Sequence, residues 1–216
     1  MLISPDLMSS LPSIMIDYAY LDLLDASSRV VQFTPADDAL WSGAVVLAPG
    51  EELALPHCAR HDLLILEGLA VADGSVLERG DFAIRRGSPR LRVGPEGVHV
   101  LAFRDACSTS CEEITVPHAD RPWCEGRTPG MLLANLSNAS HALNLVMWQP
   151  YAITRRHAHP RGEEIFVLRG ELCDEQRYPA GSWLRLHSGD WHAPHVETPT
   201  MILVRSGHLK RCGKAS

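Results

Sequence analysis

Four side chains in the C-terminal half of the sequence have the types and spacing to hold a metal ion. His157 and His159 are two residues apart, and in an extended strand such residues point to the same face. Glu163 follows four residues later, and His192 lies on a distant segment. Three imidazoles and one carboxylate suit a divalent transition metal. The sequence therefore predicts a metal site with these four ligands, with His195 as a surface residue, a hydrogen-bond partner or an alternative ligand.

The residues between these candidates predict how they meet. Pro160–Gly162 forms a turn, so that a second strand starts at Glu163 and runs antiparallel to the first. Ile165 and Val167 share the face of Glu163 by the two-residue period and would line the space behind the metal, whereas Glu164 points away and gets no ligand role. Binding needs neutral imidazoles and an ionised carboxylate, so we expect it to weaken below about pH 6.

The composition is that of a globular protein without a membrane-spanning segment. The 216 residues are 45% hydrophobic and 21% charged. No apolar run approaches the roughly 20 residues that cross a bilayer, and the N-terminus lacks the basic start of a signal peptide. The net charge of −6 argues against nucleic acid as a partner, because phosphate binding needs a basic face. Six cysteines without a CxxC pair indicate reduced thiols and a cytoplasmic protein.

Short apolar runs separated by glycine-containing turns predict many short β-strands. Only residues 16–28 have a pattern that could form a helix. When the sequence is laid on itself at a shift of 102 residues, Gly68 falls on Gly170 and Gly87 falls on Gly189. The shared features run through most of both halves, which predicts an internal duplication.

The duplication predicts two β domains of about 100 residues each. Prolines and glycines cluster between residues 108 and 130, which places the boundary in that segment. We divide the chain into an N-terminal tail over residues 1–12, a first barrel over residues 13–115 and a second barrel over residues 116–216.

The first half keeps only part of the metal constellation. At the same shift, the four candidate ligands are replaced by Leu55, His57, His61 and Arg90. Two imidazoles survive, but leucine offers no donor atom and the arginine cation would repel a metal ion. We therefore expect the first barrel to be a scaffold, a dimer surface or an emptied pocket.

The spacing H-x-H-x3-E-x6-G, followed by GDWH, resembles the two sequence motifs of the cupin superfamily, whose fold is a small jelly-roll barrel. RRHAHPRGEEIFVLRGELCDE and YPAGSWLRLHSGDWHAPH are more narrowly similar to the cupin-like domain at the C-terminal end of ChrR-type anti-sigma factors. The resemblance covers residues 130–209 strongly and residues 40–105 weakly. It implies an all-β bicupin, with two tandem jelly-roll β-barrels and the same four metal ligands.

The ChrR resemblance implies a sensing or regulatory metal module that responds to a small molecule or an oxidant. Zinc is the expected ion, and iron, manganese and nickel are alternatives. In that family a separate helical N-terminal domain binds the sigma factor and holds a zinc ion of its own. This sequence enters a β repeat directly and has no HxxxCxxC motif, which argues against sigma-factor binding.

Two other function classes stay open. A metal held by three histidines and one glutamate can leave positions for dioxygen or a chelating substrate. The chain could then be an Fe(II)- or other metal-dependent cupin dioxygenase that cleaves a dicarbonyl or hydroxyketone-type molecule, with Trp183 or Trp191 shaping its pocket. The third class is a bicupin that binds a small molecule without catalysis. We also expect a homodimer, because pairing would bury an exposed edge strand.

Overall fold

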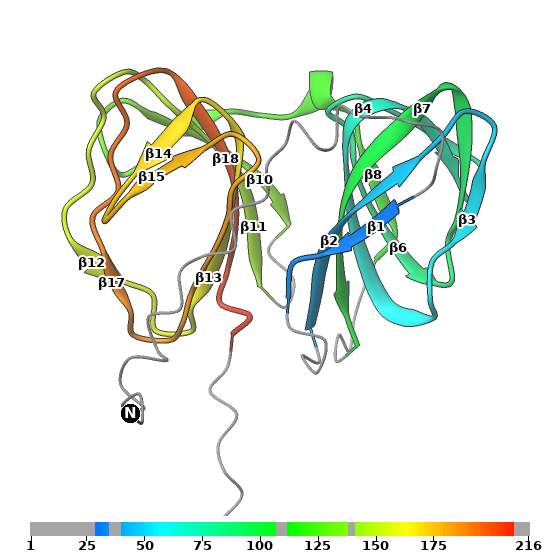
Figure 1. The fold of residues 1–216 in the computed structure, drawn as a ribbon, viewed down its shortest axis with the longest axis horizontal. Helices are drawn as coiled ribbons and strands as arrows, with labels where there is room; N and C mark the ends of the chain where they lie inside the picture. The colour runs from blue at the N-terminus through cyan, green and yellow to red at the C-terminus, as the bar shows by residue number, and fades with distance from the viewer. Residues whose placement is uncertain (1–28, 35–39, 107–111, 138–140, 210–216) are drawn as a thin grey trace, which may run out of the picture. The chain divides into compact units, whose positions relative to one another are not determined.

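The computed structural model describes residues 29–34, 40–106, 112–137 and 141–209. In these ranges the regular structure is β-strand, apart from a 3₁₀ turn at His118–Asp120. The chain forms two units, divided between Arg121 and Pro122 (Figure 1). The tail expected over residues 1–12 and the helical pattern of residues 16–28 lie outside the described residues.

The N-terminal unit is built on an antiparallel sheet with the strand order β1-β2-β7-β4-β6-β8, in which β3 pairs with β7 and β5 with β4. Its strands are β1 (Arg29–Gln32), β2 (Leu40–Leu47), β3 (Glu52–Ala54), β4 (Cys58–Ala72), β5 (Ser75–Glu78), β6 (Phe82–Gly87), β7 (Arg90–Asp105) and β8 (Ile114–Val116). The register of the long β4–β7 pair shifts on both sides of Glu67 and Gly68. Such bulges bend a strand and increase its twist, which curves the sheet.

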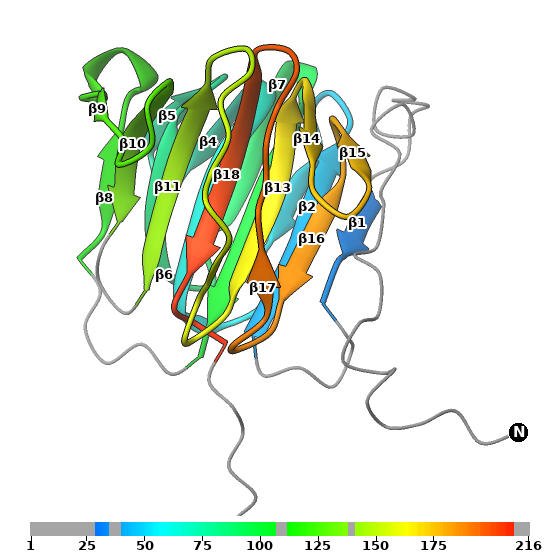
Figure 2. The ribbon, with the colours of Figure 1, turned by 90° about the vertical axis from the view of Figure 1, so that its left-hand side faces the viewer.

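The C-terminal unit has a six-stranded sheet of order β16-β13-β18-β11-β10-β9, which faces the viewer in Figure 2, and two ribbons, β12-β17 and β14-β15. Its strands are β9 (Cys124–Glu125), β10 (Met131–Ser137), β11 (Ala142–Trp148), β12 (His157–Ala158), β13 (Glu163–Arg169), β14 (Glu171–Cys173), β15 (Arg177–Pro179), β16 (Trp183–Leu186), β17 (Trp191–His192) and β18 (Thr200–Ser206).

The duplication is visible in the topology. The order β1-β2-β7-β4-β6 in one unit corresponds to β10-β11-β18-β13-β16 in the other. The register of β1–β2 recurs in β10–β11 at the shift of 102 residues. The register of β4–β7 and its bulge at Glu67 recur in β13–β18, where the bulge lies at Arg169. The predicted all-β fold with two duplicated domains is therefore confirmed.

Each unit has its own apolar core, formed by alternate residues of its strands. In the N-terminal unit Leu63 and Ile65 belong to this core, and in the C-terminal unit Ile165 and Val167 take the same places on β13. The barrel lining expected behind the candidate ligands is thus present. The inner face of β13 begins with Glu163, so that the strand brings a carboxylate to one end of an apolar barrel.

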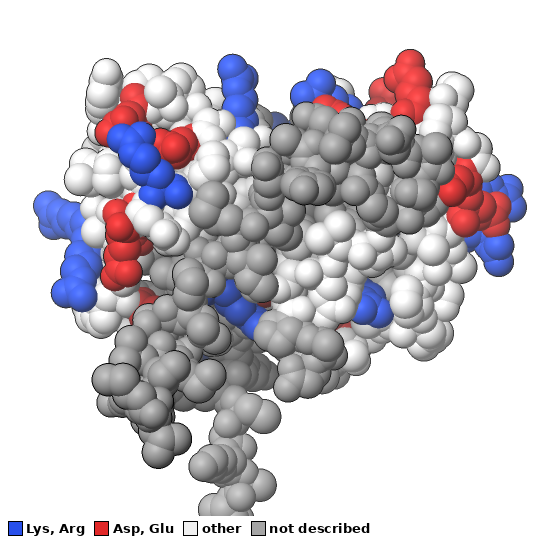
Figure 3. Space-filling model, viewed as in Figure 1, with Lys and Arg blue, Asp and Glu red and all other residues white. Residues whose placement is uncertain are grey.

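Among the described residues, no helix is long and apolar enough to cross a bilayer. On the face drawn in Figure 3, the basic and acidic side chains of the described residues are interspersed and do not form one broad basic area.

Candidate metal centre

Two short elements and one turn bring the four predicted residues together. In the β12–β17 ribbon His157 is the register partner of His192. The chain then turns back at Gly162, whose N–H donates to the carbonyl of His159 at 3.0 Å, and β13 starts with Glu163. Gly162 has φ +63°, and a Cβ there would lie 2.7 Å from the carbonyl oxygen of Leu186. The turn therefore requires glycine.

The nitrogens of the three histidines lie within 4.8 Å of one another, and the Glu163 carboxylate lies beside two of them. Nε2 of His192 lies 3.0 Å from Nε2 of His157 and 3.2 Å from Nε2 of His159. The Glu163 carboxylate lies 3.2 Å from His159 Nε2 and 3.3 Å from His192 Nε2. Ligands held at about 2.1 Å from a metal are about 3.0 Å apart at right angles and about 3.4 Å apart in a tetrahedron. The spacing of these atoms fits a first-row transition metal.

The hydrogen bond on the far side of His157 shows which of its nitrogens faces this cluster. Nδ1 of His157 lies 2.9 Å from the carbonyl oxygen of Arg155, which can only accept. The neutral ring therefore carries its proton on Nδ1, and a lone pair on Nε2 faces His192. Lone pairs at such distances repel one another unless a proton or a cation lies between them, and three imidazoles with a carboxylate suit a divalent transition metal.

Burial sets the electrostatics of the site. Glu163 is almost completely buried, which raises the pKa of its carboxyl to about 8. Burial, together with the neighbouring His157 and His159, lowers the pKa of His192 to about 3, and burial also lowers the pKa of His159. Without a cation the site therefore favours neutral forms of these groups. A divalent cation reverses this preference at Glu163, because it stabilises the ionised carboxylate.

The carboxylate of Asp174, which the sequence did not single out, lies on the Nδ1 side of the His192 ring. Asp174, in the turn after β14, places Oδ2 3.7 Å from Nδ1 of His192. Its Oδ1 accepts a hydrogen bond from the backbone N–H of Ala193 at 3.2 Å. No spacing rule connects Asp174 with the ligands, so the signal for it lies in the fold alone.

Two neighbours of the predicted ligands lie elsewhere. Glu164 points away from the centre, as expected, and its carboxylate is buried 3.2 Å from Nε2 of His208 and 3.4 Å from Nε of Arg185. His195 pairs through its backbone with Cys173 and Ile153. His195 is not among the three histidines whose nitrogens lie within 4.8 Å of one another.

Trp183 and Trp191, which we expected to shape a pocket at the metal, lie outside the barrel core. Trp191 is 58% exposed, and the guanidinium of Arg156 lies 5.4 Å from its ring centre, so this pair is on the outside of the β12–β17 ribbon. Trp183 is buried but lies outside the barrel core, whereas its neighbour Leu184 belongs to that core. Trp148 is the tryptophan that packs into the barrel core.

The corresponding positions of the N-terminal unit do not form such a centre. Leu55 is part of the apolar core, and Arg90 is exposed and ion-paired with Glu52. His61 is fully buried, with Nε2 3.1 Å from the carbonyl oxygen of Gly87, while His57 is exposed. In the described ranges, the cluster of the C-terminal unit is the one group of three or more close metal-ligating side chains.

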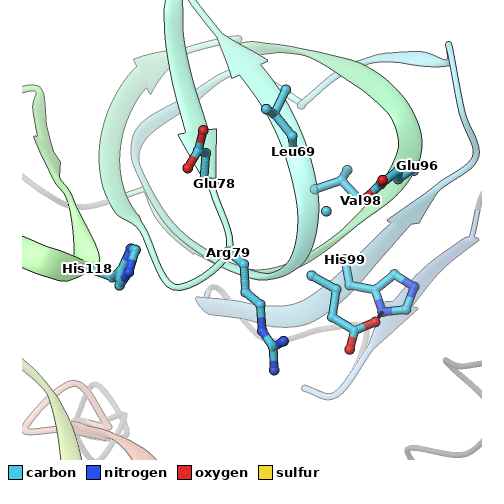
Figure 4. A pocket seen from close by; sticks show the side chains of 10 residues that line it. Leu69, Glu78, Arg79, Glu96, Val98, His99 and His118 are labelled. Atoms are coloured by element: carbon cyan, nitrogen blue, oxygen red, sulfur yellow. Dashed lines mark ion pairs between the residues drawn. The ribbon is translucent and has the colours of Figure 1, made fainter.

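The N-terminal unit has a different feature, a surface pocket of about 650 Å³ (Figure 4). Its lining combines three carboxylates, one guanidinium, two imidazoles and apolar groups, from Glu67, Gly68, Leu69, Glu78, Arg79, Glu96, Gly97, Val98, His99 and His118. His99 alternates with two core residues of β7 and therefore faces away from the barrel core. Its Nδ1 lies 3.6 Å from Glu67.

Comparison with known families agrees with the fold and with the position of the site. Residues 111–210, which include all four candidate ligands, match the model of the ChrR cupin-like domain. The match spans the C-terminal unit, which is therefore similar to a cupin domain. A search of curated protein sequences found no match.

Solved structures show the same fold across both units of the chain, and they include a cupin barrel protein, which confirms the expected cupin fold. A proposed dioxygenase from Nostoc punctiforme has a TM-score of 0.70 at 16% identity, over 83% of this chain and 73% of that one. A cupin 2 barrel protein from Leptotrichia buccalis has a TM-score of 0.65 at 12% identity, over 91% and 98%. The oxalate decarboxylase of Bacillus subtilis, studied for its Mn(II) centres, has a TM-score of 0.61 at 14% identity, over 86% and 74%. At these identities the likeness shows the fold.

Proposed function

We propose that the C-terminal barrel binds one divalent transition metal ion through His157, His159, Glu163 and His192, and that the protein is a sensing or regulatory module of the ChrR cupin-like type. The observation that carries the proposal is the cluster of three histidine side chains, with the buried Glu163 carboxylate 3.2 Å from His159 and 3.3 Å from His192. The signal would be a small molecule or an oxidant that reaches the bound ion.

The donor set favours zinc and is also compatible with iron, manganese and nickel. Zinc fits because neutral imidazoles and a carboxylate are among its usual ligands, at distances that match the observed spacing. The Mn(II) centres of the oxalate decarboxylase neighbour support manganese as an alternative on a shared fold.

The family match supports the sensing role. Residues 111–210 match the model of the ChrR cupin-like domain, and this range includes all four proposed ligands. Behind them Ile165, Val167 and Leu184 belong to an apolar core.

An Fe(II)- or other metal-dependent dioxygenase that cleaves a dicarbonyl or hydroxyketone is the second candidate. The fold likeness to the Nostoc punctiforme protein favours it. Four protein ligands also leave coordination positions free on a six-coordinate ion, and the ion would supply binding and polarisation of a chelating substrate. The residues around it would hold the apolar part of that substrate and exclude water.

Metal content and oxygen uptake separate the two candidates. The protein is purified without chelator, its metals are quantified by plasma mass spectrometry, and oxygen consumption is followed with 1,3-dicarbonyls and hydroxyketones. One zinc ion per chain without oxygen uptake supports the sensing module. Iron together with substrate-dependent oxygen uptake contradicts the sensing module and supports the dioxygenase. A protein that contains no metal and takes none up contradicts both.

The proposal includes a homodimer that works in the cytoplasm. The thiols of Cys58, Cys124 and Cys173 are free, as in a reducing compartment. Both sheets end in edge strands, which pairing of two copies would cover. Light scattering that gives the mass of a single chain at micromolar concentration would contradict the dimer.

A further inference from the structure

We infer that Asp174 is a positioning residue, which holds the imidazole of His192 in the tautomer that can bind a metal. The inference rests on the proposed metal site and adds a residue outside the four ligands. It starts from the two contacts of the Asp174 carboxylate, one to the backbone of the β17 segment and one to the ring of His192.

The two oxygens of Asp174 have separate partners. Oδ1 accepts a hydrogen bond from the N–H of Ala193 at 3.2 Å, which ties the turn after β14 to the residue that follows His192. Oδ2 lies 3.7 Å from Nδ1 of His192, on the side of the ring that faces away from the metal centre. Both side chains are well covered, with exposures of 18% for Asp174 and 5% for His192. Such a carboxylate acts on the ring with little screening by water.

On the other side of the His192 ring, a hydrogen bond to His157 would compete with metal binding, and this makes the contact with Asp174 important. Nε2 of His192 faces Nε2 of His157 at 3.0 Å, and the hydrogen bond to Arg155 leaves a lone pair on that His157 nitrogen. A neutral imidazole has a single N–H. If His192 carried it on Nε2, the ring would donate to His157, and its own lone pair would point away from the centre.

The carboxylate of Asp174 opposes this metal-blocking tautomer. A negative charge beside Nδ1 favours the proton on Nδ1, which leaves the Nε2 lone pair of His192 free to bind a cation. The separation of 3.7 Å is longer than a hydrogen bond, so Asp174 acts on the ring through its charge. Carboxylates that accept the ring N–H of a ligating histidine fix its tautomer, and their loss typically weakens metal binding about 10- to 100-fold. Asp174 thus prepares His192 for coordination before any ion arrives.

Asp174→Asn separates this role from packing. Asparagine has the same shape, and its carbonyl oxygen can still accept from the N–H of Ala193. The amide nitrogen then faces Nδ1 of His192 and donates, which favours the wrong tautomer. The matched control is Asp190→Asn, because Asp190 is a carboxylate two residues before His192 that accepts from the backbone N–H of His187 at 2.8 Å.

The test combines zinc titration calorimetry of the full chain with ¹⁵N-detected NMR of the histidine rings in metal-free protein. We expect Asp174→Asn to bind zinc about 10- to 100-fold more weakly than wild type. We also expect its His192 proton to move from Nδ1 to Nε2, with an unchanged circular dichroism spectrum. Asp190→Asn should match wild type in both measurements.

Each outcome decides something different. Wild-type affinity in Asp174→Asn together with an Nδ1–H tautomer overturns the inference about Asp174 and leaves the metal site standing. A wild-type protein that binds no metal overturns the proposed function. In that case the tautomer of His192 in the two variants still decides whether Asp174 positions the ring.

Discussion

The protonation of Glu163 is the residue-scale property with the clearest consequence. Burial raises the pKa of its carboxyl to about 8, so in the metal-free protein it is protonated at neutral pH. A metal ligand must be deprotonated, and binding therefore releases this proton. His192 and His159 do not compete in the same range, since the pKa of His192 is about 3 and that of His159 is also lowered. The sequence predicted that metal binding weakens below about pH 6. The raised pKa of Glu163 shifts this weakening to higher pH.

We predict that zinc affinity rises about tenfold per pH unit between pH 6 and 8 and becomes constant above pH 8, because one proton is displaced below the Glu163 pKa. Calorimetry in buffers with different ionisation enthalpies counts the protons released. An affinity that does not change between pH 6.5 and 8 would contradict the raised pKa.

The same carboxyl predicts the stability of the metal-free protein. The folded pKa of this carboxyl, about 8, is above its ordinary value of 4.5, so the stabilisation from the bound proton is complete below pH 4.5 and is lost as pH rises through 8. Metal-free wild type should therefore unfold more easily at pH 9 than at pH 6. Glu163→Gln, which cannot ionise, should lack this loss. Urea unfolding of both proteins at the two pH values measures it, and equal pH dependence would refute the assignment.

At the scale of elements, the turn between β12 and β13 determines whether the ligands meet. We predict that Gly162→Ala weakens metal binding and lowers the free energy of unfolding, because φ is +63° and the new Cβ would lie 2.7 Å from the carbonyl oxygen of Leu186. Gly189→Ala is the matched control, with φ +91° and no atom within 4 Å of its Cβ. It should cost about 1–2 kcal/mol of backbone strain alone. Equal losses of stability and metal affinity in both variants would contradict the steric argument.

The elements also show how far the sequence could predict the site. Alternation along β13 and the turn before it were enough to place Glu163, Ile165 and Val167 on one inner face. Asp174 could not be predicted, because it reaches His192 only through the position of the turn after β14 in the folded unit. The outward direction of Trp191 depends on the pairing of β12 with β17, for which two-residue strands leave almost no pattern in the sequence.

At the scale of the whole molecule, the two units share one strand order but differ in the side chains that could bind a metal. The C-terminal unit keeps four donor groups at the end of its barrel. The N-terminal unit has an apolar core residue in one of these places, Leu55, and a surface ion pair in another, Arg90 with Glu52. A duplicated fold can lose its ligands and keep its stability because the core, and not the site, supplies most of the burial.

This asymmetry predicts a metal stoichiometry of one ion per chain. His159 and His57 occupy equivalent positions at the shift of 102 residues, so they form a matched pair of substitutions. His159→Ala removes a donor whose Nε2 lies 3.2 Å from both His192 and Glu163, and it should abolish stoichiometric metal. His57→Ala should leave one ion per chain, because its side chain is exposed and belongs to no close group of three ligands in the described residues. Plasma mass spectrometry of both variants checks this, and equal loss from the two would show that the N-terminal unit also takes part in binding.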